Sequence, residues 1–72
     1  MDDRKSAEAR QFAIQVSLEL TRAAEAAQLA VAAGDDRTEA WKQLQQLYAR
    51  FDAASELLKN MRRAVDAAFE QP

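Results

Sequence analysis

The chain of 72 residues contains a single glycine and a single proline, and their positions limit the folds open to it. Glycine and proline are the strongest helix breakers. Pro72 ends the sequence and Gly34 lies near its middle, so residues 4–33 and 36–70 are uninterrupted. Seventeen residues are alanine, which is the best helix former. These features predict one all-α domain over residues 1–72, an antiparallel two-helix hairpin with helices at about 4–33 and 36–70.

The stretch AAGDDRTEAW carries a helix stop followed by a helix start. Gly34 suits the left-handed conformation just after a helix C-terminus, where a Cβ atom is penalised. With Asp36 as the N-cap of the next helix, Glu39 falls at the third helical position, which makes an Asp variant of the capping box. Negative charge here also favours the positive end of the helix dipole. Gly34 and Asp36 are therefore the expected turn residues.

Apolar residues in both halves recur at alternating steps of three and four, the spacing of a helix packed lengthwise on another. Folding the chain back at Gly34 opposes residues whose numbers sum to 70 or 71, such as Leu20 with Phe51. Several of these pairs set a small side chain against a large one, as close packing requires. The residues expected in this intramolecular seam are Val16, Leu20, Ala23, Ala27, Leu44, Leu47, Phe51, Leu58, Met61 and Val65. The same spacing also includes Ala9, Ala54 and Ala68.

The segment FAIQVSLEL, residues 12–20, alternates apolar and polar residues as a β-strand does. Read as a strand, it opens a strand-helix-turn-helix layout that resembles the ribbon-helix-helix repressors. The resemblance covers about half the chain and carries no specific motif. The residues on one face of that strand would be Gln11, Ala13, Gln15 and Ser17. Because Val16 and Leu20 fall on the helical seam, we expect a helix here instead.

Further apolar residues lie outside the seam, on the outer face of the first helix and at both edges of the seam on the second. An elongated hairpin buries less apolar surface than a compact domain, so an isolated hairpin is expected to be only marginally stable. We therefore expect a homodimer forming a four-helix bundle, or a bundle with another helical protein. The residues expected to contact a partner chain are Ile14, Leu18, Leu29, Trp41, Tyr48 and Leu57.

Composition argues against several kinds of site. The chain has no histidine and no cysteine, so the usual metal ligand, general base and nucleophilic thiol are missing. No glycine-rich loop is present to hold a phosphate group. We expect no catalytic, cofactor-binding or metal-binding residues and no small-molecule substrate. The lack of an apolar run of about 18 residues and of an apolar leader predicts a soluble cytoplasmic protein that does not enter a membrane.

The expected function is that of a non-enzymatic protein–protein interaction module, acting as an adaptor, a chaperone subunit or an inhibitor. The alternative is a small dimeric nucleic-acid-binding regulator, either ribbon-helix-helix-like or a hairpin dimer that binds RNA. A net charge of −2 supplies no bulk attraction to nucleic acid, and acidic residues share the open end of the hairpin with the basic ones. The basic residues expected at that end are Arg4, Lys5, Arg10, Lys59, Arg62 and Arg63.

Overall fold

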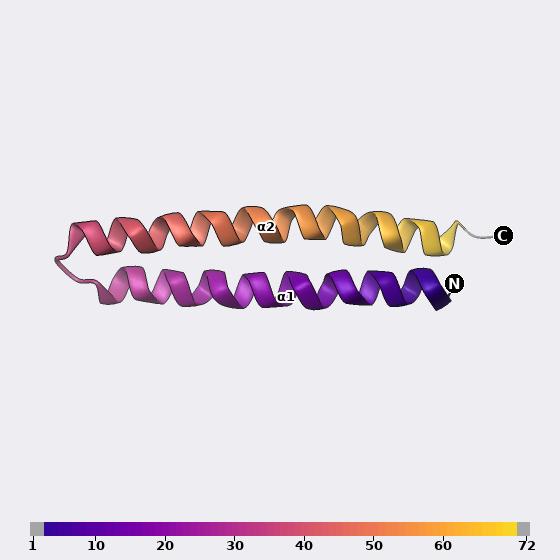
Figure 1. The fold of residues 1–72 in the computed structure, drawn as a ribbon, viewed down its shortest axis with the longest axis horizontal. Helices are drawn as coiled ribbons and strands as arrows, with labels where there is room; N and C mark the ends of the chain where they lie inside the picture. The colour runs from indigo at the N-terminus through magenta and orange to yellow at the C-terminus, as the bar shows by residue number, and fades with distance from the viewer. Residues whose placement is uncertain (1–2, 71–72) are drawn as a thin grey trace.

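The computed structural model describes residues 3–70 of the chain. Helix α1 spans Asp3–Ala32 and helix α2 spans Arg37–Phe69. Figure 1 shows the two helices lying antiparallel along their length, joined by one short connection. Each helix end lies within one residue of its predicted position, and the predicted all-α hairpin is confirmed. Residues 12–20 lie inside α1 and the described part of the chain contains no strand, so the ribbon-helix-helix layout is wrong.

The connection between the helices has the expected turn conformation at Gly34 and the expected N-cap at Asp36. Gly34 has a φ angle of 61°, in the left-handed region. The Asp36 side chain accepts a hydrogen bond of 3.0 Å from the backbone N–H of Glu39, which confirms it as the N-cap of α2. The other half of the capping box does not form. The Asp36 N–H donates to the Ala33 carbonyl, and the Glu39 carboxylate accepts from the Gln43 side chain.

The contact between the helices is built from alanine. Among the described residues, every buried hydrophobic residue is an alanine, and no large side chain is fully enclosed. A methyl group lets two helix backbones approach closely, and it loses no rotamer freedom on burial. We call this contact the alanine seam; its buried members are Ala9, Ala23, Ala26, Ala54, Ala64 and Ala68.

The alanine seam keeps the predicted positions Ala9, Ala23, Ala54 and Ala68, and it departs from the predicted seam by about one residue at the intervening positions. Ala26 and Ala64, which the predicted pattern left out, are buried. Leu20, Phe51 and Leu58 were expected between the helices, but all three are exposed, Phe51 by 61%. Their predicted burial in the hairpin is therefore wrong. The closely packed helices do not cover these three side chains, which lie at the edge of the contact.

The remaining predicted seam residues lie in or beside the contact. Ala23 is buried. The half-buried ones are Val16, Ala27, Leu44, Leu47, Met61 and Val65.

The hairpin is a single layer of two helices, and its shape leaves much surface exposed. Its extents are 58 × 13 × 10 Å, and its radius of gyration is 16.4 Å. A compact domain of this length has a radius of gyration of about 11 Å. The accessible surface is 5594 Å², about 1,100 Å² more than the roughly 4,500 Å² of a compact protein of this mass. Each helix has one neighbour, so most of its circumference faces outward.

Replacing the turn glycine tests the left-handed conformation. Gly34→Ala should lower the free energy of unfolding by about 1–2 kcal/mol, because a residue with a Cβ atom is strained in this region. A Cβ atom at Gly34 would meet nothing within 4 Å, so the loss is conformational rather than steric. Gly34→Asn should keep most of the stability, since asparagine tolerates this conformation. Urea unfolding at one protein concentration measures the difference, and equal stability of all three proteins would contradict it.

Enlarging one buried alanine tests the alanine seam. Ala23→Leu should lower the free energy of unfolding by about 1–3 kcal/mol, because three extra carbon atoms must fit between closely packed helices. Ala49→Leu is the matched control, since Ala49 is exposed on α2 and its change should stay within about 0.5 kcal/mol. Thermal unfolding followed by circular dichroism compares the two. Identical melting of both variants would place Ala23 outside the contact.

Candidate protein-interaction face

An open groove runs along each side of the alanine seam, and the two grooves differ in chemistry. One, which we call the polar groove, consists of two hollows, at residues 8–12 with 60–67 and at residues 22–29 with 43–50. Beside the apolar Phe12 and Leu29, its lining includes charged and amide side chains such as Glu8, Arg22, Gln43, Gln46, Arg50 and Arg63. The other has no charged residue among its lining side chains. We call the side with the second groove the apolar face; the groove is lined by Ala13, Val16, Ser17, Leu20, Thr21, Ala24, Phe51, Ala54, Ser55, Leu58 and Met61.

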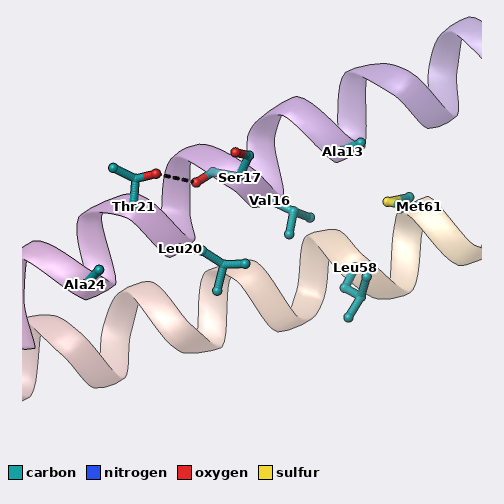
Figure 2. Close-up of a pocket in the computed structure, with 8 residues that line it drawn as sticks. All are labelled: Ala13, Val16, Ser17, Leu20, Thr21, Ala24, Leu58 and Met61. Carbon is teal, nitrogen blue, oxygen red and sulfur yellow. Dashed lines mark hydrogen bonds between the residues drawn. The ribbon is translucent and has the colours of Figure 1, made fainter.

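Figure 2 shows how side chains from both helices form this groove. Val16 and Leu20 of α1 point towards α2, where Leu58 and Met61 lie along the same stretch. The polar group of Thr21 is satisfied within α1, because its hydroxyl donates to the Ser17 carbonyl at 2.9 Å. The groove therefore offers aliphatic surface with few unmet hydrogen bonds.

A second heptad pattern runs along the apolar face, one residue after the alanine seam. One residue is a rotation of about 100°, close to the right angle at which a helix in a four-helix bundle meets its second neighbour. On α1 this second seam consists of Arg10, Ala13, Ser17, Leu20, Ala24, Ala27 and Val31. On α2 it consists of Trp41, Leu44, Tyr48, Phe51, Ser55, Leu58, Arg62, Val65 and Phe69.

Several residues of the second seam were not among the predicted interface residues. Leu20, Phe51 and Leu58 were assigned to the intramolecular contact, and Val31 and Phe69 were not assigned at all. All five are exposed. The signal that would have found them is the repeat of the three-and-four spacing one residue further along each helix.

Three predicted interface residues lie on α2. Trp41 and Tyr48 belong to the second seam and are 56% and 65% exposed. Leu57 is half-buried and lies one residue before the second seam, in the position that borders α1. Its side chain therefore contributes to the hairpin itself. Contact of Trp41 and Tyr48 with a partner stays a prediction.

The other three predicted interface residues lie on α1, away from the apolar face. Ile14 and Leu18 are exposed, and by helical spacing they point outward from the hairpin. Leu29 is also exposed, and it lines the polar groove. The structure does not bring these three together with Trp41 and Tyr48, and their contact with a partner stays a prediction.

An ion pair crosses between the helices beside the polar groove. Arg50 of α2 lies 3.3 Å from the carboxylate of Glu19 on α1, and Arg22 lies 3.6 Å from the same carboxylate. The Glu19 side chain is only 16% exposed, so this pair is better shielded than a surface salt bridge. This ion pair therefore links the two helices on the edge opposite the apolar face.

The open end of the hairpin has mixed charge. Lys59 pairs with Glu56 at 3.4 Å, and Arg62 lies 3.9 Å from Asp66. The Arg63 guanidinium donates to the amide oxygen of Asn60 at 3.4 Å. The side chain of Lys5 lies outside the part of the chain that the structure describes. Neighbouring acids offset part of the basic charge that a nucleic-acid site at this end would use.

Residues 3–70 offer no group of three or more acidic side chains placed to hold a metal ion. Neither described helix is long and apolar enough to cross a membrane. Comparison of the chain with protein-family models, curated proteins and solved structures gives no match.

The fluorescence of Trp41 reports on whether the apolar face is covered. It is the chain's one tryptophan, and it is more than half exposed in the isolated hairpin. If the second seam binds another chain, emission at high protein concentration should be blue-shifted and protected from acrylamide. Dilution should shift the emission to the red and raise the quenching constant. A spectrum typical of an exposed indole at every concentration would contradict coverage of Trp41 by a second copy.

Proposed function

We propose that this chain is a non-enzymatic protein–protein interaction module that works by forming a helix bundle with another helical chain. In this role it acts as an adaptor, a chaperone subunit or an inhibitor. The binding surface is the apolar face, and the bound helices lie along the second seam. Bundle formation itself supplies the activity, without a reacting group.

The observation that carries the proposal is the unequal chemistry of the two grooves. The uncharged groove spans residues 13–24 of α1 and 51–61 of α2, and the second seam has no charged residue from Ala13 to Val31 or from Trp41 to Leu58. Monomeric proteins rarely expose an apolar patch of more than a few hundred Å². Aromatic residues such as Trp41 and Tyr48 are also enriched among the residues that dominate binding energy.

The charge distribution favours a protein partner over a nucleic acid. Affinity for nucleic acid depends on basic side chains that neutralise phosphates. Of the open-end basic residues, Lys59 and Arg62 already lie beside carboxylates. An uncharged face does not repel another apolar helix. Binding such a helix is favourable because it removes apolar area from water.

A charge placed in the middle of the apolar face tests the proposal. Phe51→Glu should weaken association by about tenfold to a hundredfold, because burying a phenylalanine is worth about 1.5–3 kcal/mol. The hairpin should keep its helix content, since Phe51 is exposed in the isolated chain. Sedimentation equilibrium measures self-association. Recovery from a nuclease-treated extract of the native host measures association with a foreign helical protein.

The control variant is Gln46→Glu, which adds the same charge to α2 on the polar groove. It should bind as the wild type does in both measurements. Equal binding by Phe51→Glu and wild type would contradict the proposal. So would recovery of nucleic acid from a second extract, not treated with nuclease, if that recovery is lost when Arg62 and Arg63 are replaced by alanine.

A further inference from the structure

We propose that the chain on the apolar face is a second copy of the same hairpin, inverted so that the turns lie at opposite ends of the bundle. The two-fold axis passes between the helices near Ser17 and Ser55. In this arrangement α1 packs against α1 of the other copy, and α2 packs against α2. The inference rests on the proposed function and names its partner.

The order of side chains along the second seam of α2 supports a two-fold contact. In such a contact residue i meets residue j while residue j meets residue i, so the seam must match itself when read backwards. Counting outward from Ser55, large apolar residues stand at the nearest positions on both sides, Phe51 and Leu58. Aromatic residues stand fourteen positions away on both sides, Trp41 and Phe69. The small Ser55 falls at the centre, where two copies of one side chain must share space.

The intermediate positions hold unlike residues that can pair with each other when the seam is reversed. Tyr48 and Arg62 each lie seven residues from Ser55, so the inverted contact sets the guanidinium of one copy beside the phenol ring of the other. A guanidinium over an aromatic ring is attractive by about 0.5–1 kcal/mol at an exposed site. On α1 the centre is another serine, Ser17, with Ala13 and Leu20 on either side.

Electrostatic repulsion favours this arrangement over the alternative bundle in which both turns lie at the same end. With the turns together, α1 would face α2 of the other copy at the same level. Arg10 would then meet Arg62, and the symmetry would repeat this like-charge contact. Inversion instead carries Arg10 to the level of Ala24 and removes that repulsion.

The exposed area fits a pair of hairpins. Two separate chains expose twice 5594 Å², whereas a compact protein of twice the mass exposes roughly 7,450 Å². A fully compact pair would therefore bury about 3,700 Å², within the range of about 2,000–5,000 Å² typical of obligate homodimers. A second copy thus supplies enough surface to cover the apolar face without a third chain.

Single-cysteine variants test the inverted contact. The chain has no cysteine of its own, so any covalent dimer must come from the introduced thiols. Ser17→Cys and Ser55→Cys should each form a disulfide-linked dimer alone, because each residue meets its own copy at the axis, where a disulfide needs Cα atoms about 4–7 Å apart. Oxidation should be at least about tenfold faster than for Gln15→Cys, which is exposed but lies off the apolar face. Circular dichroism checks that each variant remains helical.

Three results would overturn the inference. Linkage only when Ser17→Cys and Ser55→Cys are mixed would mean that the turns lie at the same end. Oxidation no faster than for Gln15→Cys, in a chain that sediments as a dimer, would mean that copies meet through another face. A wild-type chain that sediments as a monomer would exclude the second copy. If that monomer still binds a host protein through Phe51, the proposed function stands and only its partner changes.

Discussion

The close approach of two helices along a line of alanines is the contact on which the rest of this structure depends. Methyl groups at positions such as Ala23, Ala54 and Ala64 allow the backbones to pack lengthwise, and among the described residues only alanines are buried there. The larger side chains of Leu20, Phe51 and Leu58 lie at the edge of the contact. The residues with the most apolar surface to bury are those that an isolated hairpin is least able to cover.

Different residues line the two edges of this contact, so the hairpin has one polar side and one uncharged side. On one edge Glu19 and Arg50 form an ion pair between the helices, and amide side chains surround it. On the other edge Leu20, Phe51 and Leu58 line a groove without charge. The uncharged groove therefore lies on one side of the contact, although Ile14, Leu18 and Leu29 are exposed elsewhere on α1. Glu19 and Arg50 are adjacent in sequence to Leu20 and Phe51. The same segment of the hairpin therefore carries the ion pair between the helices and the middle of the apolar face.

The sequence was sufficient to predict the helices, the turn and their axial register, but not the rotation of the helices about their own axes. The turn follows from Gly34 and Asp36, and a constant sum of opposed residue numbers follows from folding back there. That sum is nearly unchanged if both helices rotate by one residue. Apolar side chains stand at neighbouring positions such as Leu57 and Leu58, so periodicity supports either choice. Side-chain volume decides between them, because only the alternative centred on alanine lets the helices close. For the same reason the apolar face was not predicted, because Phe51 also fits the spacing of the predicted intramolecular seam.

Two seams about one residue apart have different energetic consequences. The alanine seam gives the chain its hairpin shape but removes little apolar surface per residue, because each buried side chain is a single methyl group. The second seam carries the large side chains, and in the proposed bundle it supplies most of the surface removed from water. Binding to a folded chain adds to its stability in proportion to the logarithm of partner concentration. A hairpin of this kind would therefore be most firmly folded when its partner is present. If the chain has the proposed function, the second seam therefore controls both its association and its folding.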